Sequence, residues 1–196
     1  MGQISVTPGF SDAERPQAAH LYWQAFGEKL ARTLGPTPRG EAFFAKVMNP
    51  DFALVARDAD GRMLGLAGFK TGEGSLADGG LRDLLSTYGV LGGLLRAALL
   101  APLERKVEQG TLLMDGICVG SEARGRGVGT LLLDAIKGEA AKRELSRVRL
   151  DVIDTNPRAR SLYERQGFVA TGQEQTGPLR HVFGFTESTT MVFPLP

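Results

Sequence analysis

With 196 residues and a formal net charge of +1, the chain fits one domain and has no global charge for binding nucleic acid or an anionic membrane. Its one cysteine, Cys118, excludes an internal disulfide and a multi-cysteine metal site, which fits a reducing compartment and a cytoplasmic location. There is no secretory signal, no apolar run of about 18 residues and no pair of histidines at metal-ligand spacing, so we expect no membrane span and no metal.

The first third of the chain predicts a strand, two helices and a β-hairpin. In chain order, these elements are expected at 4–7, 14–30, 41–48, 52–57 and 63–70. Ser11 or Asp12 is a candidate cap for the first helix, because such side chains accept hydrogen bonds from free backbone N–H groups. The last two strands flank the sequence Asp-Ala-Asp-Gly, which is typical of a hairpin turn.

Residues 72–110 interrupt this pattern and predict two helices inserted between strands. The segment is rich in leucine, with Gly89, Gly92 and Gly93 in its middle and Pro102 near its end. We expect a buried or amphipathic helix pair rather than a membrane attachment, because the charged residues are too few to build a basic membrane-facing surface. The insertion is expected either to cap the substrate pocket or to form a contact in a homodimer.

The second half of the chain predicts alternating strands and helices. Strands are expected at 111–119, 147–154, 168–175 and 188–195, and helices at 127–144 and 157–166. The first of these helices has apolar residues at helical spacing, namely Val128, Leu131, Leu132, Ala135, Ile136 and Ala140. The sequence therefore predicts a mixed α/β fold.

The stretch Glu-Ala-Arg-Gly-Arg-Gly-Val-Gly-Thr, at 122–130, lies between a strand and a helix. Glycines there expose the free N–H groups of the helix N-terminus, where the helix dipole favours a negative charge. Arg124 and Arg126 add two donors of charge-assisted hydrogen bonds. The arrangement of Gly125, Gly127 and Gly129 with these arginines predicts a phosphate or pyrophosphate site.

Three other phosphate-binding interpretations fit less well. A P-loop requires a lysine directly before Thr130, and none is present. A dinucleotide fold requires a different glycine spacing, although Asp151 lies about where its acidic residue is expected. A basic nucleic-acid loop is disfavoured by the low net charge and the few aromatic residues, so we expect no nucleic acid partner.

The remaining pattern is Arg-x-x-Gly-x-Gly at 124–129, and a second motif follows about thirty residues later. That motif is Asn-Pro-Arg-Ala-Arg-Ser-Leu-Tyr-Glu-Arg-Gln-Gly-Phe at 156–168. Together the two motifs resemble the acetyl-CoA signature of the GCN5-related N-acetyltransferase (GNAT) family. The close resemblance covers Leu112 to Phe168, the preceding elements match the family's order loosely, and the insertion departs from its minimal pattern.

The resemblance implies one GNAT domain over 1–196, with a mostly antiparallel sheet flanked by helices. It also implies direct transfer of the acetyl group of acetyl-CoA to an amine on a small molecule or peptide, in a ternary complex. The strands at 111–119 and 147–154 are expected to part and admit the pantetheine arm. The implied cofactor-binding residues are Ile117, Cys118, Val119, Arg124, Gly125, Arg126, Gly127, Val128, Gly129, Thr130, Asn156, Ala159 and Tyr163.

The resemblance also implies a chemistry for individual residues. Tyr163 matches the family's general acid, which protonates the departing thiolate, and the N–H of Val119 is expected to polarise the thioester carbonyl. Gly116 and Gly120 are expected to ease a bulge in the strand.

A base must deprotonate the acceptor, and Asp115 is our first candidate because strict alternation places it on the face of Ile117 and Val119. Glu104 and Glu108 are alternatives. Cys118, which alternation points away from Asp115, is expected to be a core residue rather than a nucleophile. A CoA-binding sensor without transferase activity is the alternative function.

Overall fold

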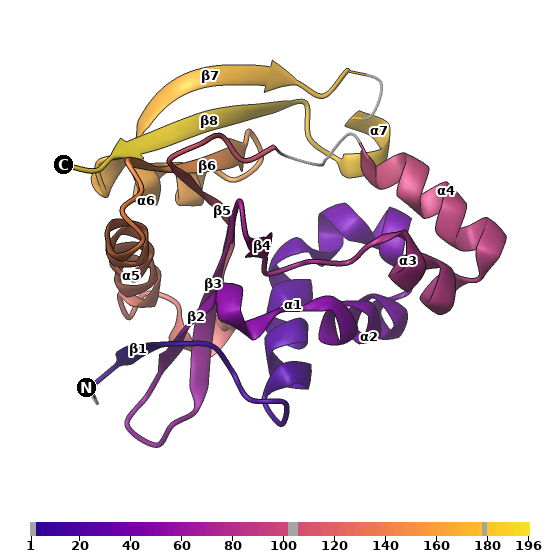
Figure 1. Cartoon of the computed structure of the whole chain (residues 1–196), viewed down its shortest axis with the longest axis horizontal. Coiled ribbons are helices and arrows are strands. Elements are labelled where there is room, and N and C mark those ends of the chain that lie inside the picture. Colours follow the sequence, from indigo (N-terminus) through magenta and orange to yellow (C-terminus); the bar gives the residue numbers. More distant parts are fainter. Residues whose placement is uncertain (1–2, 102–105, 178–179) are drawn as a thin grey trace.

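An eight-stranded sheet crosses the protein, and helices lie on both sides of its central strands (Figure 1). The computed structural model describes residues 3–101, 106–177 and 180–196. The strands are β1 (Ser5–Pro8), β2 (Ala53–Arg57), β3 (Met63–Thr71), β4 (Gly74–Ser75), β5 (Thr111–Val119), β6 (Arg147–Ile153), β7 (Val169–Gln175) and β8 (Glu187–Pro194). The helices are α1 (Arg15–Leu34), α2 (Thr37–Val47), α3 (Leu81–Tyr88), α4 (Val90–Leu100), α5 (Val128–Lys142), α6 (Pro157–Arg165) and α7 (Arg180–Phe183).

The sheet is mixed but mostly antiparallel, as predicted. Its strand order is β1-β2-β3-β5-β6-β8-β7, with β4 paired to β3. Each neighbouring pair is antiparallel except β5 and β6, which are parallel because α5 connects them as a crossover. In the described part of the chain, no helix has both the length and the apolar composition to cross a bilayer.

Two glycines show which helix covers which face of the central strands. A Cβ added to Gly65 of β3 would lie 3.4 Å from a methyl group of Val128, so α5 covers that face. A Cβ added to Gly116 of β5 would overlap the ring of Phe26, so α1 covers the opposite face. Figure 1 shows the same division, with α5 and α6 on one side of β3 and β5 and with α1 and α2 on the other.

The buried face of α5 differs slightly from the predicted stripe. Val128, Leu132, Ile136 and Ala140 are buried as expected. Leu131, however, is 38% exposed, and Leu133 is buried in its place. The helix is rotated relative to the predicted face because its apolar side chains pack on several strands at once, which sequence periodicity cannot specify.

The first helix is not capped as predicted. Its N-cap residue is Glu14, and no side chain caps the first turn. The N–H and hydroxyl of Ser11 instead donate to the carboxylate of Glu14, which also forms a 2.9 Å ion pair with Arg57. Asp12 pairs with Arg15. The candidate caps are therefore engaged by neighbouring side chains.

The inserted helices are present as α3 and α4, while three other features differ from the prediction. Helix α2 begins at Thr37, ahead of the predicted start, because Pro38 is tolerated in a first turn that needs no N–H donor. Strand β4 and helix α7 were not predicted, since elements of two and four residues have no measurable periodicity.

Candidate active site

Strands β5 and β6 pair over only part of their length. Their parallel register ends where Leu113 lies opposite Arg149. Beyond that point, residues 114–119 of β5 and 150–153 of β6 have no pairing with each other. The expected parting of these two strands is therefore present, and we call the place the β5–β6 opening.

A β-bulge lies at the start of the opening, as predicted for the vicinity of Gly116. Met114 and Gly116 pair with consecutive residues of β3, Phe69 and Gly68, so Asp115 is an extra residue between them. A bulge bends its strand and locally disturbs the ladder. Here the bulge removes Asp115, the one acidic residue of β5, from the regular alternation of side chains between the two faces of the sheet.

The bulge overturns the prediction that Asp115 shares a face with Ile117 and Val119. Met114 and Ile117 pair with alternate residues of β3 and so lie on the same face, with two residues between them. Asp115 instead interacts with the backbone of Leu76, on the side of the sheet that α1 covers. The extra residue resets the alternation, which no count along the sequence anticipates.

The surroundings of Asp115 make its carboxylate unusually basic. Burial raises its pKa from 3.8 to about 6, although the positive charge of Lys70 and a backbone hydrogen bond from Leu76 act in the opposite direction. Its Oδ2 atom is buried and has no hydrogen-bond partner among the described residues. A carboxylate in this state is ionised at neutral pH and can accept a proton from a bound group.

Two aromatic residues of α1 lie against the bulge. The ring centroids of Tyr22 and Phe26 are 4.6 Å apart, and the ring of Phe26 covers Gly116. Burial, followed by the nearby Asp115 and Cys118, raises the pKa of Tyr22 well above its usual value. Cys118 and Gly116 pair with alternate residues of β3, so Cys118 lies on the face that α1 covers, as Asp115 does, which corrects the prediction that the two point apart.

Sequence reasoning missed Tyr22 and Lys70 as neighbours of the site. Tyr22 precedes Phe26 by one helical turn, so their i, i+4 spacing on one helix face was the available signal. Lys70 lies near the end of a predicted strand, and only the register of β3 against β5 brings it close to Asp115.

Tyr163, on α6, lies near Cys118 in the unpaired part of β5. Tyr163 is 7% exposed, and its hydroxyl makes no hydrogen bond with the described residues. Burial and the nearby Cys118 raise the pKa of Tyr163 to about 12, so the hydroxyl keeps its proton at neutral pH. Asn156 holds the start of the helix, because its side-chain Oδ1 accepts a 3.2 Å hydrogen bond from the N–H of Ala159.

Cys118 is a core residue, as predicted. It is 1% exposed, and burial raises the pKa of its thiol. The thiolate is the nucleophilic form of cysteine, so a buried thiol with a raised pKa is a poor nucleophile.

The glycine-rich loop presents free backbone donors at the start of α5. Gly125 and Gly127 have φ angles of 76° and 80°, which favour glycine, and a Cβ at either would meet open space. The backbone N–H groups from Gly125 to Thr130 donate to no described group. These donors fit an anion such as the phosphates of a nucleotide. Gly129 differs, since its Cβ would lie 3.1 Å from Leu162, so it permits close packing of α5 on α6.

The two arginines of the loop differ in their surroundings. The guanidinium of Arg124 donates a long hydrogen bond of 3.4 Å to the carbonyl of Val119 and is exposed. Arg126 is half-buried and makes no hydrogen bond or ion pair with the described residues. Both arginines therefore remain available as donors to an anion at the loop.

The backbone of β5 directs donors into the opening. The N–H of Gly120 donates to the carbonyl of Leu64 at 2.9 Å, which extends the ladder with β3. Successive strand residues direct their N–H groups to opposite neighbours. The N–H groups of Val119 and Ile117 therefore point away from β3, toward the part of β6 that does not pair with β5.

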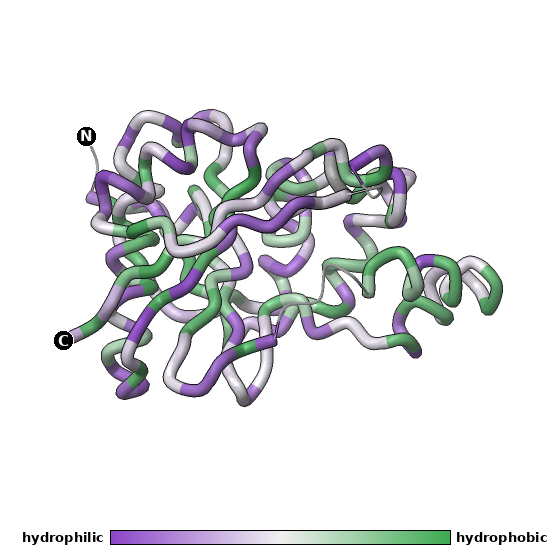
Figure 2. Tube along the Cα trace, turned by 90° about the horizontal axis from the view of Figure 1, so that it is seen from above, coloured by the Kyte–Doolittle hydropathy of each residue, from purple (hydrophilic) through white to green (hydrophobic). Residues whose placement is uncertain are grey.

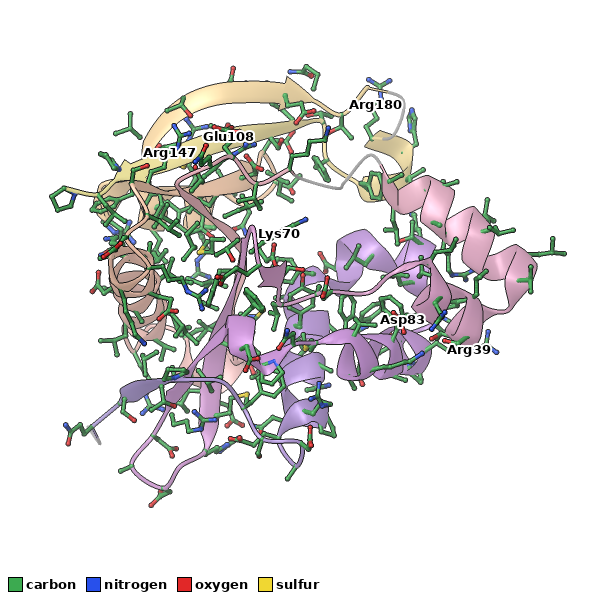
Figure 3. The ribbon with its side chains drawn as sticks, in the orientation of Figure 1. Arg39, Lys70, Asp83, Glu108, Arg147 and Arg180 are labelled. Carbon is green, nitrogen blue, oxygen red and sulfur yellow. The ribbon has the colours of Figure 1, made fainter. Side chains whose placement is uncertain are left out.

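The alternative carboxylates are less suited to act as a base. Glu108 forms ion pairs of 2.7 Å with Arg147 and 3.3 Å with Arg149, and Figure 3 shows it beside Arg147 and apart from Lys70. Glu104 lies outside the described residues. Within the described ranges, no three His, Cys, Asp or Glu side chains come together as a metal-ion cluster.

The sequence model of the acetyltransferase (GNAT) family matches residues 15–168. The chain belongs to this family. GNAT enzymes use acetyl-CoA, and family membership indicates acetyl transfer to an amine on a small molecule or protein. The matched residues include the bulge, the glycine-rich loop and Tyr163.

Solved structures of other acetyltransferases share the GNAT fold of this chain. A GCN5-related N-acetyltransferase from Kribbella flavida is 21% identical with a TM-score of 0.64, over 98% of each chain. An N-acetyltransferase from Staphylococcus aureus is 15% identical with a TM-score of 0.66, over 99% of each chain. The ribosomal-protein-S18-alanine N-acetyltransferase from Escherichia coli is 18% identical with a TM-score of 0.59, over 98% of this chain and 94% of that chain.

Proposed function

We propose that the protein transfers the acetyl group of acetyl-CoA directly to an amine within a ternary complex. The observation that carries the proposal is the β5–β6 opening, which has a basic carboxylate at its start and a protonated phenol on α6 near Cys118 of β5. Such a pairing of base and acid suits a reaction that removes one proton from the attacking amine and returns one to the leaving thiolate.

The donor is proposed to lie along the opening, with its phosphates at the glycine-rich loop. The free N–H groups from Gly125 to Thr130, together with Arg124 and Arg126, fit a pyrophosphate. The N–H groups of Ile117 and Val119 are available to the pantetheine arm and to the thioester carbonyl. Negative charge that develops on that carbonyl oxygen is stabilised by a fixed backbone donor.

The chemical step is proposed to need no acyl-enzyme. The ammonium group of the acceptor first gives one proton to Asp115, which releases it to solvent. The neutral amine nitrogen then attacks the thioester carbon, the carbon–sulfur bond breaks, and the departing sulfur takes the proton of Tyr163. The tyrosinate recovers a proton from the nitrogen as that nitrogen becomes an amide. A covalent intermediate on Cys118 is disfavoured because the raised pKa of that buried thiol keeps it protonated.

The acceptor is proposed to approach from the face of α1. Tyr22 and Phe26 form an aromatic wall there, and Asp115 supplies a negative charge that attracts an ammonium group. These groups suit an amine attached to an apolar or aromatic body, on a small molecule or on a peptide.

A thermal-shift titration tests the donor assignment. At 100 times its dissociation constant, a ligand stabilises the folded state by about 2.7 kcal/mol, which raises Tm by about 5–10 °C at this chain length. We expect this shift with acetyl-CoA and with CoA, and none with ATP or NAD. A shift with NAD alone contradicts the proposal, and a shift with acetyl-CoA but no turnover over an amine panel favours a CoA sensor.

Replacing Tyr163 with Phe tests the proposed acid. We expect kcat to fall about 10–100-fold, because a thiol with a pKa near 8.5 leaves without much assistance. The dissociation constant for acetyl-CoA is expected to change little, since the ring remains in place. Steady-state kinetics and a titration measure the two quantities, and an unchanged kcat rules out Tyr163 as the acid.

A further inference from the structure

Large apolar side chains gather on the outside of the arm formed by α3 and α4. Five of them are between 49% and 86% exposed, namely Leu81, Val90, Leu91, Leu94 and Leu95. Elsewhere in the described residues, the exposed large hydrophobic side chains are Leu131 and Val169. Figure 2 shows the arm as a largely hydrophobic extension at the edge of the protein.

The exposed residues of α4 follow a helical repeat. Leu91, Leu94, Leu95 and Ala98 are spaced at i, i+3, i+4 and i+7, and all four are exposed. We call these four residues the outer stripe. A stripe with this spacing normally packs against a core, so its exposure to water is unfavourable.

The opposite side of α4 already anchors the helix. Gly93 is buried, and a Cβ there would lie 2.8 Å from the backbone of Leu85 in α3. Ala97 and Leu100 pack against the hydrophobic core. The contacts with the hydrophobic core are thus made by other residues of α4, and the outer stripe is left facing water.

The outer stripe carries no charge. Arg96 is the one ionisable residue of α4, and its guanidinium lies 4.1 Å from the ring centroid of Tyr88. The same guanidinium donates a 3.1 Å hydrogen bond to the carbonyl of Gly92, so it is folded back along the helix. The outer stripe itself therefore offers no charged group to anionic lipid, nucleic acid or charged peptides, and a second copy meets it without repulsion.

The size of the patch also suits a second copy. At these exposed fractions, the five side chains leave on the order of 500 Å² of apolar surface in water, near the upper end for a monomer. Two such patches facing each other bury on the order of 1,000 Å², which reaches the lower limit for a specific interface.

We propose that the protein is a homodimer in which the outer stripe of α4, together with the exposed Leu81 and Val90 of the same arm, packs on the same surface of a second copy. A two-fold axis makes such an interface self-complementary, because the same surface of each copy forms both sides of the contact. Figure 1 shows the arm at the edge of the protein far from both termini and from α5 and α6, so the second copy does not cover the glycine-rich loop.

Analytical ultracentrifugation over a wide concentration range tests the proposal. We expect twice the monomer mass for the unaltered protein. The double variant Leu91→Glu, Leu95→Glu places like charges opposite each other and is expected to raise the dimer dissociation constant at least about 100-fold. Val169→Glu is the matched control, because Val169 is 63% exposed on β7, outside the arm, and is expected to leave the mass unchanged.

A cysteine cross-link locates the interface. Cys118 is buried, so Leu94→Cys adds an accessible thiol to α4 that a short bis-maleimide can join to its counterpart in the dimer. We expect a cross-linked dimer from Leu94→Cys and none when Leu91→Glu and Leu95→Glu are added. A Tm shift with acetyl-CoA that persists in the glutamate variant shows that the fold is intact.

Two results overturn the proposal. One is a monomer at every concentration, with or without the glutamates. The other is a monomer that sediments with neutral phosphatidylcholine vesicles and loses this binding in the glutamate variant, which assigns the outer stripe to a lipid surface. Both tests are independent of the acetyl transfer reaction.

Discussion

Replacing Asp115 with Asn is expected to lower kcat/KM about 10²–10⁴-fold, the usual contribution of a general base. The amide keeps the size of the carboxylate but cannot take a proton from the ammonium group of the acceptor. In the unaltered enzyme, kcat/KM is expected to rise with pH up to about 6, where the carboxyl becomes ionised. At higher pH, ionisation of Asp115 is complete and contributes no further rise. Steady-state rates from pH 5 to pH 8 with one acceptor measure both effects, and Asp115→Asn is expected to lack this rise.

The same substitution is expected to change stability in a pH-dependent way. The pKa of Asp115 is raised from 3.8 to about 6 in the folded protein, so folding favours the protonated form. The contribution of this group to the free energy of unfolding is therefore fully present below pH 3.8 and is lost as the pH rises to about 6. A difference of roughly two pKa units corresponds to about 3 kcal/mol.

Asparagine never becomes charged, so the variant escapes that loss. The free energy of unfolding of the variant, minus that of the unaltered protein, is expected to increase by up to about 3 kcal/mol from pH 4 to pH 8. A destabilisation by the amide that does not depend on pH is the same at both values and cancels from this comparison. Urea unfolding at the two pH values measures this change. Equal stability differences at both values contradict the assignment of a raised pKa.

Glu108→Gln separates the two candidate bases. Glu108 is paired with two arginines, so its replacement is expected to leave the pH profile unchanged and to alter kcat/KM little. If Glu108→Gln abolishes the rise with pH and Asp115→Asn does not, then Glu108 is the base.

Replacing Gly127 with Val is expected to weaken acetyl-CoA binding at least about 100-fold. The new side chain extends into the open space beside the free N–H groups, where it interferes with hydrogen bonds to a phosphate that are each worth about 1.5–3 kcal/mol. Because φ is 80° at this position, a β-branched residue also costs roughly 1–3 kcal/mol of stability. A titration by calorimetry measures the affinity, and circular dichroism establishes that the variant is folded.

Gly61→Val is the matched control for the strain. Gly61 has a φ of 82° and also has nothing within 4 Å of an added Cβ, but it lies in the turn between β2 and β3. We expect a similar loss of stability from Gly61→Val without a change in affinity for acetyl-CoA. Normal affinity in a folded Gly127→Val protein means that this glycine does not serve a phosphate.

Much of the fold and the outline of the site could be predicted because their signals are local. The hairpin turn, the apolar spacing of α5 and the glycines ahead of it each involve residues within a few positions of one another. The two spaced motifs at 124–129 and 156–168 added the family, and with it the expected parting of β5 and β6. The free N–H groups of the loop follow from the same local sequence, since a helix start leaves its first donors unpaired.

The state of Asp115, by contrast, was decided by the tertiary structure. Its face depends on a bulge in the register between β3 and β5, and its pKa is raised by burial beneath α1, against the opposing effect of Lys70. Tyr22 lies near Asp115 because α1 packs on β5, which is also a feature of the tertiary structure. The sequence alone thus determined which backbone could hold an anion and which motifs were present. Strand register and burial arise from residues far apart in the chain, so only the folded protein decided which carboxylate is basic and which helix face stays in water.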